Sequence, residues 1–311
     1  MLRSRTNIKT PTVTSNVIGS NISHKMETKK LYHWNDIPEW QKDNHYIFSG
    51  YVKETLSYLE CLRSLTYLHN ESVNIYTHLL PGTVFFGGIF WFFEYYMEYF
   101  PSTTWQDQFA FSLFSFGAAT ALTLSSCFHC LKSHSECVAT FGNKLDYLGI
   151  IILIITSMVS ILYYSLIDLP GIRNFFWGLT MAFGAVCSVF SLNDRFRTNK
   201  WRPYRALMFV LFGLSGVFPI IAGWWILGGE EVFRRSDLWW VIAEGALYIF
   251  GAFLYAARVP ERFAPGKFDI WGHSHQIFHV LVVIAACCHG RGLMGAYLYS
   301  HHYTIPSMLM A

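Results

Sequence analysis

The stretch "GHSHQIFHVLVVIAACCHG", from Gly272 to Gly290, combines an apolar run with four histidines. The run is close to the roughly 20 residues that cross a bilayer as a helix. A charged side chain inside hydrocarbon costs on the order of 3 kcal/mol, so ionisable residues in membrane helices usually serve a function. The stretch therefore predicts a membrane fold with a polar site inside it.

The whole chain has the composition of a membrane protein. Of its 311 residues, 53% are hydrophobic and only 14% are charged, whereas a soluble domain has about 25% charged residues. Seven apolar blocks cover residues 75–97, 106–130, 145–165, 172–192, 204–227, 238–257 and 271–298. We expect an all-α integral membrane protein, a seven-transmembrane helix bundle, whose last span ends near Gly290 because "HGRGLMG" interrupts it.

The positions of Lys and Arg predict the orientation of this bundle. Of the 23 Lys and Arg residues, only Arg173, Arg234, Arg235 and Arg291 fall on the side opposite the N-terminus. Because short loops rich in Lys and Arg stay in the cytosol, we expect a cytosolic N-terminus and a C-terminus outside or in a lumen. The net charge of +3 is too small to indicate nucleic-acid binding, and seven cysteines, an odd number, do not indicate a disulfide framework.

Four parts of the chain differ in composition. Residues 1–30 are rich in Ser, Thr, Asn and Lys and are predicted to be a disordered cytosolic N-terminus. Residues 31–74 predict a folded segment on the cytosolic membrane face with one short amphipathic helix, which either lies at the interface or packs on the bundle. Residues 75–300 hold the seven helices, and residues 301–311 form a short non-cytosolic tail.

Three histidines are predicted to meet near the cytosolic face. His129 ends the second apolar block, while His275 and His279 lie one helical turn apart at the start of the last block. Asp146 enters from the same side. Three histidines with an open fourth position form the ligand set of a catalytic zinc site, so the pattern favours bound Zn²⁺. The alternative is that the rings hydrogen-bond to one another, to Asp146 or to backbone carbonyls.

Other polar residues in the apolar blocks are assigned less specific roles. His273 should face away from its two neighbours on the same helix, and His289 should lie at the outer interface. Cys127 and Cys130, in "SCFHC", are alternative metal ligands. Glu244 should face the interior of the bundle or a watery cavity, without a role that the sequence assigns.

Several motifs of this chain resemble those of the progestin and adipoQ receptor family, which includes the adiponectin receptors and haemolysin-III-like proteins. The motifs are "SSCFHCLKSHSECVATFGNKLDYLGI", "FDIWGHSHQIFHVLVV", "ESVNIYTHLLPG" and "IPEWQKDNHYIFSGY", and the resemblance covers roughly residues 31–298. The family pattern of Ser, three residues, His and then Asp falls on Ser125, His129 and Asp146. The paired histidines of its last helix fall on His275 and His279. The resemblance implies that the three histidines hold zinc, with the Asp and the Ser close to it.

A further motif of the same family opens the first helix. Glu71 and Asn74 match its Glu-x-x-Asn pattern, which related ceramidases share. The chain departs from the family at Gly272 and His273, which replace a more usual bulky and polar pair. This departure leaves the ligand assignment intact and adds one nearby imidazole.

The chemistry of such a site favours hydrolysis of an amide. Zn²⁺ can polarise a carbonyl and lower the pKa of a bound water to about 7. Asp146 could orient that water or take its proton, and Ser125 could hydrogen-bond a reacting oxygen or fix the Asp. Because the site lies among apolar helices, we expect a membrane lipid substrate, with ceramide, cleaved to a sphingoid base and a fatty acid, as the candidate.

Two other functions stay open at the level of the sequence. The chain could be a receptor for an extracellular protein ligand, with a purely structural zinc, or a protein of zinc or sterol homeostasis without catalysis. Homo-oligomers are compatible with either function. The expected location is the plasma membrane or the endoplasmic reticulum.

Overall fold

The computed structural model describes residues 31–96, 100–196 and 198–310. The disorder predicted for residues 1–30 lies outside these ranges. Within them every regular element is a helix, apart from one isolated antiparallel bridge between Tyr32 and Tyr51. The elements are η1 (Trp34–Asp36), η2 (Glu39–Gln41), α1 (Tyr58–Arg63), η3 (Ser64–Thr66), α2 (Ser72–Tyr96), α3 (Trp105–Leu131), α4 (Glu136–Ser165), α5 (Pro170–Leu192), η4 (Asp194–Phe196), η5 (Asn199–Trp201), α6 (Arg202–Leu214), α7 (Val217–Leu227), α8 (Gly229–Arg235), α9 (Leu238–Ala257), α10 (Ser274–Tyr299), η6 (Ser300–Thr304) and α11 (Ile305–Met310).

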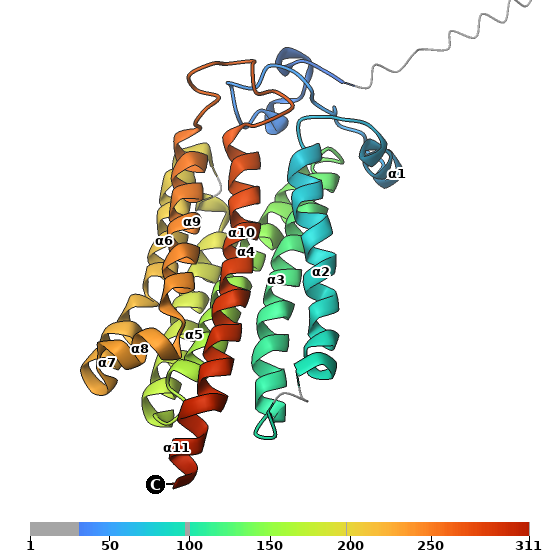
Figure 1. The fold of residues 1–311 in the computed structure, drawn as a ribbon. Helices are drawn as coiled ribbons and strands as arrows, with labels where there is room; N and C mark the ends of the chain where they lie inside the picture. The colour runs from blue at the N-terminus through green and yellow to red at the C-terminus, as the bar shows by residue number, and fades with distance from the viewer. Residues whose placement is uncertain (1–30, 97–99, 197, 311) are drawn as a thin grey trace, which may run out of the picture. The chain divides into compact units, whose positions relative to one another are not determined.

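The long helices pack side by side as a bundle (Figure 1). Around the bundle α2 contacts α3, α3 contacts α4, α4 contacts α5, α5 contacts α6, and α6 contacts α9. Helix α10 packs between α9 and α2 and also touches α3 and α4. The last helix therefore lies against both the first and the third helix of the bundle, and the all-α prediction is confirmed.

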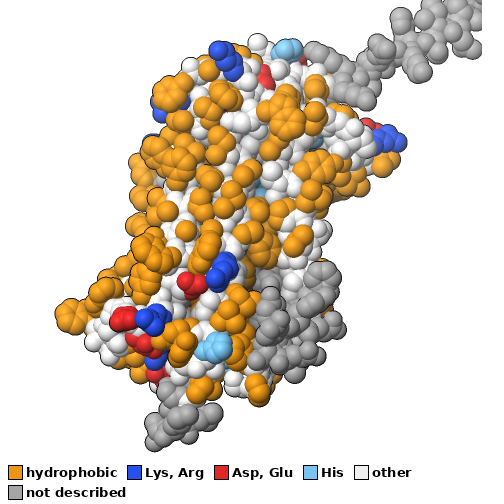
Figure 2. All heavy atoms as spheres, in the orientation of Figure 1, with side chains coloured by type: hydrophobic (Ala, Val, Ile, Leu, Met, Phe, Trp, Pro, Cys, Tyr) orange, Lys and Arg blue, Asp and Glu red, His pale blue; other side chains and the backbone are white. Residues whose placement is uncertain are grey.

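Six helical segments of the described chain are long and apolar enough to cross a membrane. They are α3, α4, α5, the α6–α7 pair over Arg202–Leu227, α9, and α10 with its extension to Thr304. Helix α2 is not among these six, and its first turns carry Asn74, Thr77 and His78. Large apolar side chains cover the flanks of the helices, as with Val189 and Trp225, and Figure 2 shows this cover along one face. Such a surface is suited to lipid rather than water.

Two helix boundaries differ from the predicted apolar blocks. Helix α4 begins at Glu136, well before residue 145, because Ser135 caps it and its hydroxyl accepts a hydrogen bond from the Val138 amide at 3.4 Å. The cap sets the start of the helix, whereas the apolar block marks only its later part. The fifth block is divided into α6 and α7, since Pro219 has no amide proton to donate to the Ser215 carbonyl.

The predicted end of the last span near Gly290 is wrong. Helix α10 continues without a break to Tyr299 and is followed by the π-helical turn η6. Glycines of "HGRGLMG" serve packing instead, because a Cβ atom at Gly295 would clash with the Asp237 carboxylate, and one at Gly292 would lie 3.2 Å from Trp240. Small residues at such contacts let membrane helices approach closely.

The segment before α1 folds onto the end of the bundle where α10 begins. Its own small core consists of Ile37, Ile47 and Tyr51. Asp269, in the loop between α9 and α10, accepts hydrogen bonds from the Phe48 amide at 2.9 Å and from the segment's Ser49 hydroxyl at 2.6 Å. The segment is therefore folded, and it holds the loop that leads into α10.

Helix α1 has an exposed leucine face. Leu59 and Leu62 are 57% and 52% exposed, as is Leu56 just before the helix at 71%, whereas Cys61 is fully buried. The backbone carbonyl of Cys61 lies 3.7 Å from the Cys130 thiol of α3. The helix thus contacts the bundle through one side, and its leucine face is free of the bundle, as an interfacial helix requires.

Candidate metal centre

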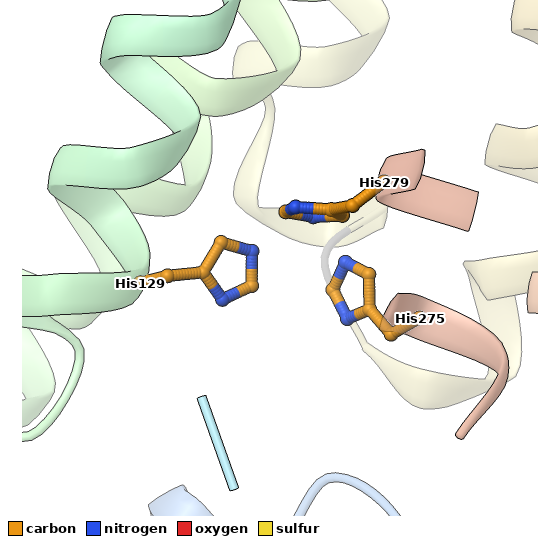
Figure 3. A group of neighbouring side chains, drawn as sticks. All are labelled: His129, His275 and His279. Carbon is orange, nitrogen blue, oxygen red and sulfur yellow. The ribbon is translucent and has the colours of Figure 1, made fainter. Parts of the chain in front are cut away.

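Three histidines from two helices point toward one another inside the bundle (Figure 3). His129 comes from the last turn of α3, and His275 and His279 come from the first turns of α10. One ring nitrogen of each lies within 4.8 Å of those of the other two. His129 and His279 are buried and His275 is half-buried. The structure therefore brings together the three residues that were predicted as metal ligands.

Two of the rings are held by their outer nitrogens. Nδ1 of His129 donates to Oε2 of Glu71 at 2.7 Å, and Nδ1 of His279 donates to the Asn74 carbonyl at 3.0 Å. The remaining nitrogen, Nε2, is then the one that carries a lone pair toward the cluster. Nε2 of His129 is buried and has no hydrogen-bond partner among the described residues.

Glu71 is the centre of a charged network beside the cluster. Besides His129, its carboxylate accepts hydrogen bonds from the Asn74 side-chain amide at 2.6 Å and from Nζ of Lys132 at 2.7 Å. Lys132 lies 3.4 Å from Asp43 as well. Burial of Lys132 disfavours its charge, but Glu71 and Asp43 outweigh burial and hold the pKa of its amine above the ordinary value. A fixed cation therefore faces the carboxylate that orients His129.

The start of α10 is fixed by buried side chains of the preceding loop. Glu261 is fully buried, and it accepts hydrogen bonds from the Ser274 amide at 2.8 Å and the Ser274 hydroxyl at 2.5 Å. The Gln276 side chain donates to the Asn70 carbonyl at 3.2 Å. Glu261 thus satisfies the free Ser274 amide at the helix end, and together with the Gln276 contact it sets the direction in which His275 and His279 point.

His78 of α2 lies against the cluster without joining it. Its ring stacks on the His279 ring, with centroids 3.8 Å apart and planes 10° apart. Its Nε2 donates to the backbone carbonyl of His279 at 3.2 Å. The contact fixes the position of α2 against α10 and is structural.

The two residues predicted to act in catalysis lie beside the cluster. Asp146 of α4 is 9% exposed, and its carboxyl is close enough to the His129 ring and the Ser125 hydroxyl for both to act on its charge. The Ser125 hydroxyl is buried and makes no well-formed hydrogen bond to any described residue, although it lies near enough to Asp146 to act on that carboxyl. A buried hydroxyl without a partner is costly unless something else binds it.

The other predicted candidates do not join the cluster. Nε2 of His273 donates a hydrogen bond to the Asn70 carbonyl at 3.2 Å, so its ring faces away from the other two histidines of the helix, as predicted. Cys127 is exposed, and Cys130 contacts α1. Within the described ranges, the group of nitrogen, sulfur and carboxylate ligands that could share an ion holds the three histidines alone.

The interfacial position predicted for His289 is wrong. His289 is 2% exposed, and its Nδ1 lies 2.8 Å from Oε2 of Glu244 on α9. Its Nε2 lies 3.4 Å from the Ser160 hydroxyl of α4. The residue is buried because α10 continues beyond Gly290, so His289 lies within the helix and not at its end. The prediction that Glu244 faces the interior is confirmed, since it is 9% exposed.

The donor set suits zinc. In the described chain no hydrogen bond joins one of the three rings to another, whereas the outer nitrogen of His279 bonds to a backbone carbonyl, as the alternative to a metal site also expects. Neutral imidazoles whose second nitrogen is fixed by a carboxylate or a carbonyl are the usual ligands of Zn²⁺. The unpartnered Nε2 of His129 is the atom that a metal would satisfy.

Comparison with known proteins identifies the family. A family profile described as Haemolysin-III related matches residues 66–290. The chain belongs to this family. It is 54% identical over 277 residues to the ADIPOR-like receptor IZH2 of Saccharomyces cerevisiae, covering 89% of this chain and 87% of that protein. It is 39% identical over 282 residues to the adiponectin receptor protein of Drosophila melanogaster, covering 89% of this chain and 62% of that protein.

The family assignment confirms the resemblance that the sequence motifs indicated. Like those relatives, this member of the haemolysin-III-related family is an adiponectin-receptor-like, multi-pass integral membrane protein. The match at residues 66–290 contains all three clustered histidines together with Glu71, Ser125 and Asp146.

Two positioning residues of the site were not predicted by chemical reasoning. Glu71 was noted only as a motif match, although a carboxylate just before an apolar block, on the side of the three histidines, is a signal for a histidine partner. Glu261 gave no such signal, because its partner Ser274 is an unremarkable residue 13 positions later.

Proposed function

We propose that this protein is a zinc-dependent hydrolase of a lipid amide, with a ceramide-like substrate, linked to lipid signalling. The observation that carries the proposal is the buried and unpartnered Nε2 of His129, which faces the rings of His275 and His279. When bound there, Zn²⁺ would supply a Lewis acid toward a carbonyl oxygen and would acidify a water molecule. Three protein ligands leave one position open for these groups.

The residues around the cluster have distinct roles in this proposal. Glu71 and Asn74 hold the outer nitrogens of His129 and His279, and so they orient the ligands. Asp146 takes a proton from the attacking water as a general base and passes it to the leaving amine. The unpartnered hydroxyl of Ser125 donates a hydrogen bond to the reacting oxygen.

A membrane lipid fits the surroundings of the site. The cluster is enclosed by helices that span the apolar part of the protein, and the aromatic rings of Phe128, Tyr255 and Phe278 lie beside the histidine rings. A water-soluble amide would have to give up its hydration to reach this position. An amide with long acyl chains reaches it from the bilayer without that cost.

The membrane arrangement that we propose has seven spans, with α2 as the first. Helix α2 packs on α3 and α10, and Leu80, Val84, Phe86 and Phe90 on its outer side are 61%, 73%, 59% and 63% exposed. These side chains are suited to contact lipid. The N-terminus is cytosolic and the C-terminus is outside, so the zinc site lies near the cytosolic face of the plasma membrane or the endoplasmic reticulum.

A second function is favoured by the names of the relatives, which are called receptors. In that case zinc would only tie α3 to α10, and the protein would bind an extracellular partner. The experiment that separates the two functions is release of fatty acid from labelled ceramide by the purified protein, with zinc measured in the same sample. Turnover that follows zinc content supports the hydrolase, and its absence from zinc-loaded protein excludes it.

A further inference from the structure

A cavity of 420 Å³ lies at the end of the bundle where the segment before α1 meets α6 and α9. Four cationic side chains line it: Lys42, Arg202, Arg258 and Arg262. A single carboxylate, that of Asp43, shares the lining. Its volume lies within the range of roughly 300–1,000 Å³ that is typical of pockets for small ligands. We call these four cations and the space between them the basic pocket.

Arg202 brings an under-satisfied charge into the basic pocket. The residue is 7% exposed, and its Nε has no hydrogen-bond partner among the described residues. Its nearest carboxylate oxygen, on Asp43, lies 3.7 Å from Nη1, which is too far for a hydrogen bond. Asp43 is also shared with Lys132 at 3.4 Å. A buried guanidinium is costly unless it is paired, so this one is suited to an additional anion.

Arg258 contributes a second charge that its neighbours do not neutralise. Its guanidinium donates to the backbone carbonyl of Asp43 at 2.5 Å and to the side-chain oxygen of Asn44 at 3.2 Å, and both acceptors are neutral. Arg258 also has a left-handed backbone, with a φ of 55°, at the end of α9. Glycine is the usual residue in this conformation at a helix end. The guanidinium is thus held by neutral acceptors, with the carboxylates of Asp43 and Glu261 acting on its charge without a hydrogen bond, at a position where the backbone favours a residue without a side chain.

The two remaining cations lie at the rim of the basic pocket. Arg262 is exposed and donates to the Ala257 carbonyl at 3.2 Å, again a neutral acceptor. Lys42 pairs with Glu39 at 2.6 Å, but the Glu39 side chain is 89% exposed. An ion pair with so exposed a partner contributes little stability, so Lys42 readily exchanges Glu39 for another anion.

We propose that the basic pocket binds a phosphate-bearing ligand, either the phosphorylated headgroup of an anionic lipid or a soluble phosphate ester. A phosphomonoester carries a charge of about −1.5 to −2, which matches the excess of the four lining cations over the two carboxylates that act on them, Asp43 in the lining and the buried Glu261. The planar guanidinium groups of Arg202 and Arg258 suit phosphate oxygens in a bidentate arrangement. The Trp34 and Tyr46 rings that also line the cavity give the group that carries the phosphate an apolar wall.

The basic pocket is distinct from the histidine cluster. None of its lining residues is a candidate metal ligand. Two links join the pocket to the cluster. The Tyr255 ring lies 3.9 Å from the Arg202 guanidinium and 4.9 Å from the His275 ring. Asp43 is connected through Lys132 to Glu71. Phosphate binding can therefore be measured in protein whose zinc ligands have been removed.

Binding is tested on the purified full-length protein with three probes. These are inorganic phosphate, soluble inositol 1,4,5-trisphosphate, and nanodiscs of phosphatidylcholine with and without phosphatidylinositol 4,5-bisphosphate. We expect saturable binding of the trisphosphate. Retention of the phosphorylated lipid, but not of phosphatidylcholine, identifies a lipid headgroup, whereas binding of the soluble probes alone identifies a soluble phosphate ester.

Variants decide whether the basic pocket is the binding site. Arg258→Gln should weaken binding by roughly 10- to 100-fold, the effect of losing a hydrogen bond between charged groups. The double change Lys42→Gln with Arg262→Gln leaves the buried arginines intact and should also weaken phosphate binding. Arg63→Gln, at an exposed cation of α1, is the matched control and should bind like the parent. Absence of binding to all probes, or equal binding by the parent and both pocket variants, would overturn the proposal.

Discussion

Nδ1 of His129 lies 2.7 Å from Oε2 of Glu71, and this contact joins the last turn of α3 to the residue that precedes α2. The same carboxylate pairs with Lys132, which follows α3 directly. A single acidic side chain thus fixes both the ring of His129 and the end of the helix that carries it. The orientation of Nε2 toward His275 and His279 follows from this contact.

Replacing Glu71 by Gln should weaken zinc binding. The amide can still accept a hydrogen bond from His129, but it carries no charge to increase the basicity of the ring or to pair with Lys132. Loss of such a partner typically lowers metal affinity by about 10- to 100-fold. Competition with a chelator of known affinity measures the change. Glu60→Gln, at an exposed carboxylate of α1, is the control, and equal zinc affinity in both variants would argue against a role for Glu71.

Replacing His129, His275 or His279 by Ala should remove most of the bound zinc. Each change leaves two ligands, and two imidazoles hold zinc far more weakly than three. Zinc per protein, measured by elemental mass spectrometry after dialysis, should fall from about one to a small fraction. His273→Ala removes a histidine next to the cluster and should retain the metal. A triple variant that keeps its full zinc content would place the ligands elsewhere.

The buried pair of Glu244 and His289 should stabilise the protein only as a pair. His289→Leu leaves the carboxyl group of Glu244 buried without its partner, and breaking a buried pair typically costs about 3–5 kcal/mol. Adding Glu244→Leu removes the orphaned group, so the double variant should regain much of the lost stability. Thermal unfolding in detergent compares the three proteins. A double variant less stable than the single one would show that the two residues are not coupled in this way.

The orientation of the bundle is tested with tags at the two ends of the chain. Because most Lys and Arg residues lie on one side, an N-terminal tag should be reached by antibody only after the membrane is permeabilised. A C-terminal tag should be reached by antibody without permeabilisation in cells that express the protein at the surface. Protease protection of microsomes gives the same test for an internal membrane. The reverse pattern would contradict the proposed orientation, and two ends on the same side of the membrane would contradict the seven spans.

The sequence was sufficient for the cluster because its geometry depends on local periodicity and on alternation of helices. His275 and His279 are one turn apart on any helix, and a chain that crosses the membrane repeatedly brings His129 to the same end. Periodicity and the alternation of helices do not predict the contacts that fix the rings. Glu71 reaches His129 across 58 residues, and Asn74 reaches His279 across 205.

Helix ends were predicted less well than the apolar blocks. The cap at Ser135 and the packing of Gly295 against Asp237 depend on single atoms, whereas hydropathy averages over many residues. The error at Gly290 had a consequence for the interior, since it placed His289 at an interface and concealed its contact with Glu244. A glycine in a membrane helix is thus better interpreted as a site of close packing than as a break.

The most direct test of the proposed hydrolysis compares the parent protein with Asp146→Asn in one zinc-quantified assay on labelled ceramide. Asn keeps the size of the side chain but cannot take a proton. General acid–base groups are typically worth about 10²–10⁴-fold in rate. We expect zinc-dependent turnover in the parent, and a loss of that size in the variant while zinc stays bound. Parent-like turnover in the zinc-loaded variant would exclude Asp146 as the base. No turnover by the zinc-loaded parent on ceramides of several chain lengths would contradict the hydrolase.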